Sequence, residues 1–220
     1  LEFRRVLFRS SMPLRVLEHP LAAHIITHLR DHTTKPATFR TLAYQISLLL
    51  AIEATGELET EITPIETPLE KIAGRVLPHD PLVVVPILRA GLGMVQPFTD
   101  IFPDVSVGYI GIERDHVTAL PRSYYCKLPP LRGSSARQVF VVDPMLATGG
   151  SAVAALNVVK EAGAIRPTLI SIVSAPEGVA EVEKHHPDTL IHTAALDREL
   201  NAKKYILPGL GDFGDRLYGT

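Results

Sequence analysis

The stretch QVFVVDPMLATGGSAVAAL, from Gln138 to Leu156, decides the fold of this 220-residue chain. It begins with a continuous apolar run that ends in one aspartate, Asp143, and it passes through a small, glycine-containing turn into an alanine-rich segment. A short apolar run of this kind is typical of a strand that is buried on both faces, and the alanine-rich segment favours a helix. The sequence therefore predicts a strand, a tight turn and a helix, which is the unit that builds parallel sheets.

The same pattern recurs on both sides of this stretch. Short apolar runs occupy residues 82–88, 105–114, 166–175 and 189–196, and helical segments follow the first and third of them. Short β-rich runs that alternate with helices indicate an α/β fold. We therefore expect a mostly parallel central sheet flanked by helices.

The N-terminal third has a different character. Residues 19–32 and 36–55 carry apolar side chains at helical spacing, so two N-terminal helices are predicted. Residues 60–69 alternate between polar and apolar types and are expected to form an edge strand, which tolerates their prolines. Residues 1–11 are basic and contain no methionine, so we expect a non-native or disordered leader before a single domain at residues 12–220.

Two polar segments interrupt the pattern. DHVTALPRSYYCKLPPLRGSSAR, residues 115–137, contains several prolines and a Tyr-Tyr pair. Because long loops in compact domains are often functional, we expect a hairpin arm or a mobile flap that closes over a site and keeps water out. The charged run DRELNAKK, residues 197–204, is expected to be a solvated turn.

Composition excludes several classes of protein. The formal net charge of −2 gives no electrostatic reason to expect a nucleic-acid partner. The longest apolar runs, such as ISLLLAI at residues 46–52, are too short to span a bilayer, so no membrane partner is expected. The single cysteine, Cys126, cannot form a disulfide within the chain, which fits a reducing compartment.

The turn within the opening stretch has the chemistry of a phosphate cradle. Thr148, Gly149, Gly150 and Ser151 lie where a helix should begin, and the first amides of a helix are free to bind an anion. Asp143, at the strand end, is placed to accept hydrogen bonds from hydroxyl groups or to help hold a cation. The alternative is a tight turn in which a hydroxyl side chain only caps the helix. The turn matches neither the P-loop nor the G-x-G-x-x-G spacing.

Other strand ends offer further binding groups. Arg89 follows the run at residues 82–88 and precedes two glycines, which suits a diphosphate, although a plain surface arginine is the alternative. Arg114 ends another strand, where a solvated charge is the simpler interpretation. GLGDFG at residues 209–214 matches G-x-G-x-x-G, but too little chain follows for a dinucleotide-binding unit. Such a glycine-rich loop can instead present backbone groups to a small planar ligand.

Taken together, these stretches resemble one family, the uracil phosphoribosyltransferases. VVPILRAGLGM, VVDPMLATGGS, SAPEGVAEVEKHHPD and YILPGLGDFGD occur in order, and the resemblance spans residues 12–220. The wider type I phosphoribosyltransferase group commonly has two adjacent acids before the cradle. Here the second position is Pro144, which resembles the uracil branch.

The resemblance implies a reaction and a set of residues. The phosphoribosyl group of 5-phosphoribosyl 1-diphosphate (PRPP) would pass to uracil, with Mg²⁺ required mainly as a complex with PRPP and UMP as product. Asp212 and Arg89 would carry the catalytic stabilisation, and no side chain is assigned as a direct metal ligand. The implied uracil-binding residues are Ile206, Gly211, Asp212 and Phe213. The implied PRPP-binding residues are Arg89, Arg114, Asp143, Pro144, Met145, Leu146, Ala147, Thr148, Gly149, Gly150, Ser151 and Asp212.

One departure leaves two alternatives open. Phe213 stands where a small alanine is common in the family, so transfer to another base is one alternative. A weakly catalytic or non-catalytic regulator that senses PRPP or UMP is the other. The resemblance also implies a cytoplasmic enzyme and a homo-oligomer, a dimer or larger, and it leaves activation by GTP open.

Overall fold

The computed structural model describes residues 14–79, 82–114, 121–131 and 137–220. The expected leader at residues 1–11 therefore lies outside the described part of the chain, as do residues 115–120 and 132–136 of the expected flap. Within the described ranges, no helix is long and apolar enough to cross a membrane.

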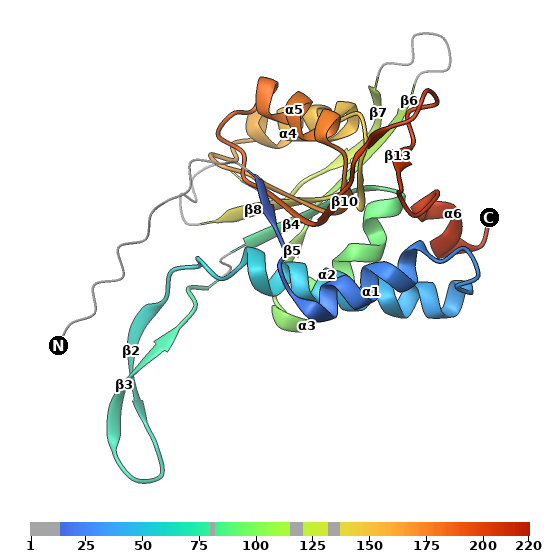
Figure 1. The fold of residues 1–220 in the computed structure, drawn as a ribbon. Helices are drawn as coiled ribbons and strands as arrows, with labels where there is room; N and C mark the ends of the chain where they lie inside the picture. Colours follow the sequence, from blue (N-terminus) through green and yellow to red (C-terminus); the bar gives the residue numbers. More distant parts are fainter. Residues whose placement is uncertain (1–13, 80–81, 115–120, 132–136) are drawn as a thin grey trace, which may run out of the picture.

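A mostly parallel sheet forms the centre of the molecule (Figure 1). All of its strand pairs are parallel except the one between its last two strands, β6 and β7. Two short strands, β5 (Ser106–Val107) and β9 (Met145–Leu146), pair with β4 and β10 beside the main order. That order is β1 (Leu14–Val16), β11 (Ile191–Leu196), β10 (Thr168–Ser174), β8 (Gln138–Val142), β4 (Leu82–Leu88), β6 (Tyr109–Arg114) and β7 (Pro121–Lys127). The predicted fold class is confirmed.

Helices cover both faces of the sheet, as Figure 1 shows. On one face lie α4 (Gly150–Glu161) and α5 (Pro176–His185), which bury aliphatic side chains against the strands. The other face is covered by α1 (Pro20–Arg30), α2 (Pro36–Ala54), the short 3-10 helix η1 (Ala90–Met94) and α3 (Val95–Ile101). Strands between two such layers must be apolar on both sides, and β4 and β10 are buried almost throughout.

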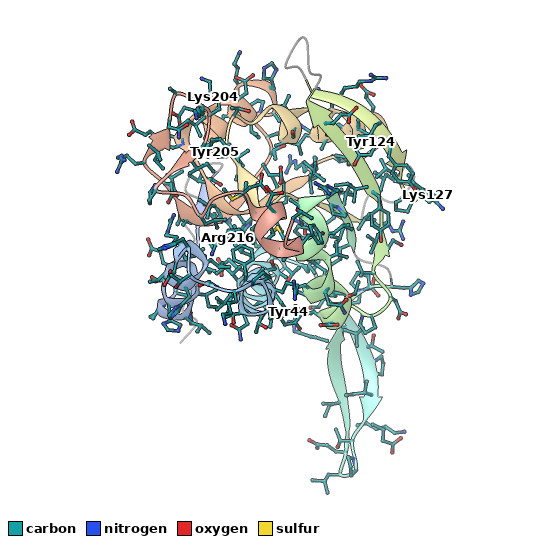
Figure 2. All side chains as sticks on the ribbon, turned by 90° about the vertical axis from the view of Figure 1, so that its right-hand side faces the viewer. Tyr44, Tyr124, Lys127, Lys204, Tyr205 and Arg216 are labelled. Carbon is teal, nitrogen blue, oxygen red and sulfur yellow. The ribbon has the colours of Figure 1, made fainter. Side chains whose placement is uncertain are left out.

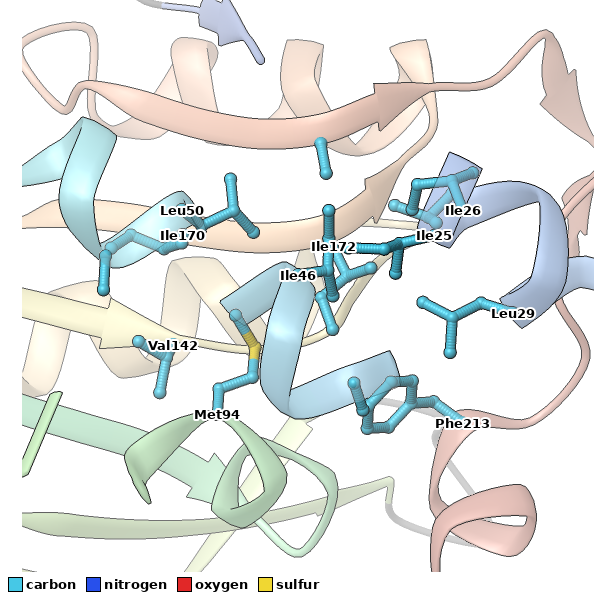
Figure 3. Close-up of a cluster of buried hydrophobic side chains, with 14 of the residues drawn as sticks. Ile25, Ile26, Leu29, Ile46, Leu50, Met94, Val142, Ile170, Ile172 and Phe213 are labelled. Carbon is cyan, nitrogen blue, oxygen red and sulfur yellow. The ribbon is translucent and has the colours of Figure 1, made fainter. Parts of the chain in front are cut away.

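The core on the α1 and α2 side reaches the C-terminal end of the chain. Figure 3 shows Ile25 and Leu29 of α1 near Ile46 of α2, with Phe213 in the same cluster. Phe213 begins α6 (Phe213–Tyr218), and its ring lies 5.2 Å from that of Phe39, edge to face. The two predicted N-terminal helices are thus confirmed, and they form part of the platform on which the C-terminal segment rests.

The arm, residues 61–76, corrects one prediction. β2 (Glu61–Glu66) and β3 (Lys71–Val76) pair with each other as an antiparallel hairpin, separate from the central sheet. In Figure 1 this hairpin projects away from the body of the molecule. The expected edge strand at residues 60–69 is therefore a strand of this arm, and its alternation reflects a two-stranded ribbon rather than a sheet edge.

The hairpin expected at residues 115–137 is described in part. β6 and β7 are antiparallel neighbours, with Tyr109 opposite Lys127 and Arg114 opposite Pro121. The connection between them lies outside the described residues. Its expected closing motion stays a prediction.

Candidate active site at the carboxyl edge of the sheet

The predicted site residues gather at one edge of the sheet. Of the predicted residues, Arg89 follows β4 and Asp143 follows β8. Asp197, which the sequence does not predict as a site residue, follows β11, and these three strands are all parallel. Loops after parallel strands meet at the carboxyl edge, where α/β sheets bind ligands. The strand order therefore brings together segments that are far apart in the sequence.

The phosphate cradle, residues 143–151, surrounds a small polar hollow of about 50 Å³. Gly149 precedes α4 with φ at 81°, and no side chain caps this helix start. The first amides of α4 therefore keep their capacity to bind an anion. The lining residues are Asp143, Met145, Leu146, Ala147, Thr148, Gly149, Ser151 and Ala152.

Two predicted members of the cradle are not among the residues that line its hollow. Gly150 is the first residue of α4 and is not part of the lining. Pro144 directs its carbonyl away toward β10, where it accepts hydrogen bonds from the N–H groups of Ile172 (3.1 Å) and Val173 (3.0 Å). Pro144 thus fastens the turn to the neighbouring strand.

A glycine that the sequence did not single out supports the cradle from α5. A Cβ atom at Gly178 would lie 2.5 Å from the carbonyl oxygen of Ala147, and one at Gly149 would lie 2.8 Å from the carbonyl oxygen of Gly178. Both distances are too short for real atoms. Only glycine at both positions allows α5 to touch the backbone of the cradle, so a contact across the sheet edge fixes its shape.

Asp143 is electrostatically unusual. Burial raises the pKa of its carboxyl group to about 7, and a hydrogen bond from the N–H of Met145 opposes the rise. A carboxylate with this pKa gains stability from any hydroxyl donor or cation that arrives beside it. Perturbed pKa values of this kind are common at functional sites.

A second hollow lies next to the cradle and has a volume of about 330 Å³; we call it the base pocket because the residues predicted to bind a base line it. Met145 and Ala147 line both hollows, so one ligand can extend from one into the other. The pocket is lined by Ala90, Met145, Ala147, Lys203, Lys204, Tyr205, Ile206, Gly211, Asp212, Phe213 and Gly214. All four residues predicted to contact a planar ligand are in this set.

Five further lining residues were missed by sequence reasoning, and two of them are Ala90, which begins η1, and Gly214, which follows Phe213 in α6. Lys203, Lys204 and Tyr205 come from the turn between β12 (Glu199–Leu200) and β13 (Ile206–Leu207). Figure 2 shows Lys204 and Tyr205 projecting from this turn. The sequence predicts that the charged run at residues 197–204 is a solvated turn. That interpretation is wrong at its start, because Asp197 is only 7% exposed.

Phe213 does not fill the base pocket with its ring. The residue is 1% exposed, and its ring packs on Phe39 within the core (Figure 3). Its side chain therefore lies among the N-terminal helices rather than where a ligand would bind. The phenylalanine that stands here in place of alanine fills space in the core, and it does not by itself indicate a different base.

Asp212 has a structural role in addition to its place at the pocket. It is the N-cap of α6, and its Oδ1 accepts a hydrogen bond from the N–H of Asp215 at 2.9 Å. This is the local capping role that aspartate favours. The Asp212 side chain is exposed, so the side chain that caps α6 is also the one predicted to contact the substrate.

The structure describes the surroundings of one of the two predicted arginines, Arg89, but not those of the other, Arg114. The exposed Arg89 precedes η1, and its carbonyl accepts hydrogen bonds from Leu92 N–H (3.1 Å) and the Tyr218 hydroxyl (3.2 Å). Glycine is required at position 91, since a Cβ atom there would lie 2.6 Å from the carbonyl oxygen of Val142. Arg114 ends β6, but its side chain lies outside the described part of the structure.

No group of three or more potential metal-ligating side chains occurs within the described ranges. The cradle contributes a single carboxylate, Asp143. Mg²⁺ is commonly bound through one or two carboxylates together with substrate phosphates rather than by an all-protein cage. The residues present fit a magnesium ion that arrives with most of its ligands supplied by PRPP.

The fold and the paired hollows define a class of protein: an α/β protein with a ligand-binding site at the carboxyl edge of a parallel sheet. The sequence model described as uracil phosphoribosyltransferase matches residues 16–220. The uracil phosphoribosyltransferase of Thermosipho africanus is 51% identical over 95% of this chain and 100% of its own length. The uracil phosphoribosyltransferase of Fervidobacterium nodosum is 50% identical over 94% of this chain and 99% of its own length. The chain therefore belongs to the uracil phosphoribosyltransferase family.

A solved structure is similar over nearly the same range. The structure of the AQ2163 protein from Aquifex aeolicus superimposes with a TM-score of 0.88 at 33% sequence identity. The match covers 94% of this chain and 98% of that one. With this coverage, the similarity is not confined to the central sheet.

Proposed function

We propose that this chain transfers the phosphoribosyl group of PRPP to N1 of uracil and forms UMP and diphosphate. Membership of the uracil phosphoribosyltransferase family supports this activity. The observation that carries the assignment of roles is the pair of adjacent hollows that share Met145 and Ala147. A nucleotide needs an anion site at one end and a planar site at the other, and these hollows have those characters.

The cradle is assigned to the phosphoribosyl end. Thr148, Gly149, Gly150 and Ser151 would bind the 5-phosphate through helix-start amides and hydroxyl groups. Asp143 would accept hydrogen bonds from the ribose hydroxyls. Pro144, Met145, Leu146 and Ala147 would shape the floor between the two ends. This arrangement would hold C1 of the ribose in line with the base.

The diphosphate and the base occupy the other assigned positions. Arg89 and Arg114 would stabilise the leaving diphosphate, together with Mg²⁺ bound mainly through PRPP, as negative charge develops on it. Ile206, Gly211, Asp212 and Phe213 would surround uracil, chiefly through backbone groups. Asp212 lines the base pocket and would also assist at the reacting centre. Asp212 and Arg89 are therefore the proposed catalytic residues.

A direct assay tests the activity. Purified protein is mixed with Mg²⁺, labelled uracil and PRPP, and UMP formation is followed over time. We expect UMP in proportion to protein, and we expect little product from cytosine or a purine base. Failure of the folded protein to form UMP contradicts the proposal, and preferential use of another base replaces uracil with that base.

The arm supports a homo-oligomer as part of the proposal. Leu69 is 95% exposed and Ile62 is 69% exposed, and both lie on a hairpin that projects from the body. Exposed apolar surface of this kind favours contact with another protein surface. We propose a second copy of this chain as that partner. Light scattering should give at least a dimer, and replacing Ile62 and Leu69 by serine should shift the mass toward the monomer.

The remaining expectations belong to the same proposal. Residues 12–220 would act as one phosphoribosyltransferase domain. The single cysteine fits a reducing compartment, so we place the reaction in the cytoplasm. Activation by GTP stays open, and the same assay with and without GTP tests it.

A further inference from the structure

The C-terminal loop, residues 208–211, joins β13 to α6 and contributes to the base pocket. Two of its residues have left-handed backbones, Gly209 with φ at 62° and Gly211 with φ at 83°. Glycine has no side chain that packing can hold, so hydrogen bonds must fix the orientation of its peptide groups. The groups that make these bonds therefore help to position Gly211, which lines the base pocket.

An ion pair between Arg30 and Asp197 holds both backbone groups of Gly209. Oδ2 of Asp197 accepts a hydrogen bond from the N–H of Gly209 at 2.8 Å, and Nη1 of Arg30 donates to the Gly209 carbonyl at 2.8 Å. The two side chains also bind each other through both guanidinium nitrogens, at 2.8 and 2.5 Å. The two peptide groups that flank the Cα atom of Gly209 are thus held, one through its donor and the other through its acceptor, by a single bidentate pair.

Neither charged side chain lines the base pocket. The side chains of Arg30 and Asp197 are 24% and 3% exposed, so the carboxylate is withdrawn from water. Buried ion pairs contribute little to stability compared with apolar residues of similar size, because desolvation offsets their attraction. Bonding to both groups of Gly209 instead gives the pair a role in setting the orientation of the loop.

A second arginine connects the same loop to the end of α1. Arg216 of α6 donates to the carbonyl groups of Leu29, Leu210 and Asp31, the last two at 2.7 and 2.6 Å. Its guanidinium group lies 4.5 Å above the ring of Phe39. The last carbonyl groups of a helix lack partners within the helix, so Arg216 satisfies them while it ties down the loop. The end of α1 therefore acts as the platform for the loop.

We propose that Asp197 and Arg30 are positioning residues for the base: they orient Gly209 and, through it, the backbone groups at positions 211–213 that face the nucleobase. The inference rests on the proposed function and deepens it, since it separates base recognition from PRPP binding. The cradle receives no hydrogen bond from this pair. Loss of the pair should therefore weaken use of uracil and leave binding of PRPP unchanged.

The test compares D197N and R30K with the wild-type protein. D197N removes the charge that pairs with Arg30, and R30K replaces a forked donor by a single ammonium group. We expect kcat/KM for uracil to fall about 10- to 100-fold in D197N and by a smaller factor in R30K. A loss of this size is expected when a bound substrate is slightly misplaced. The Kd of PRPP, measured by calorimetry without turnover, should stay at the wild-type value. If D197N does not fold, R30K carries the test.

Two controls separate positioning from general stability. D188N removes an ion pair with Lys160 at a distant surface, and L82A opens a cavity at the amino end of β4, away from the site. L82A should lose stability without a selective loss of uracil use. Equal losses for uracil and PRPP in D197N and R30K, or no loss, overturn the proposal. If the wild-type protein forms no UMP, the proposed function fails. The positioning role can then still be tested by measuring the affinity for UMP by calorimetry, which should be lower in D197N than in the wild type.

Discussion

The cradle and the base pocket lie side by side and are built in opposite ways. The cradle comes from one continuous segment, residues 143–151, between a strand and the helix that follows it. The base pocket is lined by several separate segments, among them the C-terminal loop, which is held by Arg30 and Asp197 from distant parts of the chain. A site made from local backbone geometry and one made from long-range contacts should respond differently to substitution.

The largest expected effect is on the base side, with the replacement of Phe213 by alanine. Removing a fully buried ring that packs on Phe39 should lower the free energy of unfolding by about 3–5 kcal/mol. Preference for uracil over other bases should be unchanged, because the ring lies in the core. Chemical denaturation measures the first quantity and competition between bases the second.

Phe98 provides a matched control for this variant. It is also fully buried and lies 5.7 Å from the ring of Phe140, away from the pocket lining. Its replacement by alanine should cost a similar amount of stability. A changed base preference in the Phe213 variant, with little loss of stability, would show that the ring contacts the ligand.

On the cradle side, Asp143→Asn should change how stability depends on pH. The pKa of Asp143 in the folded protein, about 7, lies above the ordinary value of 3.8, so the stability from this group is complete below the lower value and is lost as pH rises through the upper one. As pH rises from 4 to 8, the free energy of unfolding of D143N should increase relative to that of the wild type by up to about 4 kcal/mol. This follows from about 1.4 kcal/mol for each pKa unit between the two values. Urea unfolding of the ligand-free proteins across this range measures the difference. A constant difference contradicts the raised pKa.

The third effect concerns the leaving group. Replacing Arg89 by alanine should lower kcat/KM for PRPP about 100-fold, equal to about 3 kcal/mol, if this side chain stabilises the departing diphosphate. The melting temperature should change little because Arg89 is exposed. Arg166 is also exposed and lies after α4, outside both hollows, so Arg166→Ala is the control. Similar activity in the two variants contradicts the assigned role.

The same contrast explains what the sequence could predict. The strand–turn–helix at residues 138–156, the two N-terminal helices and the parallel sheet follow from local periodicity, and all are confirmed. The arm was misplaced because alternation identifies a strand but not its partner. Asp197 was misread because its burial depends on Arg30, 167 residues away. The residues next to Asp197 in the sequence give no indication of so distant a partner.

The smallest expected effect tests whether the cradle is as locally determined as this contrast suggests. Gly178 belongs to α5, and a Cβ atom there would press on the carbonyl groups of Ala147 and Leu146, at 2.5 and 2.8 Å. Gly178→Ala should therefore displace the cradle backbone and raise KM for PRPP about 10-fold, equal to about 1.4 kcal/mol, with the KM for uracil nearly unchanged. Gly56→Ala is the control, since its Cβ atom would make only ordinary contacts with its own helix end. If PRPP binding is unaffected, the segment 143–151 holds its shape without α5. A selective rise shows that even the most local part of the site needs one long-range contact.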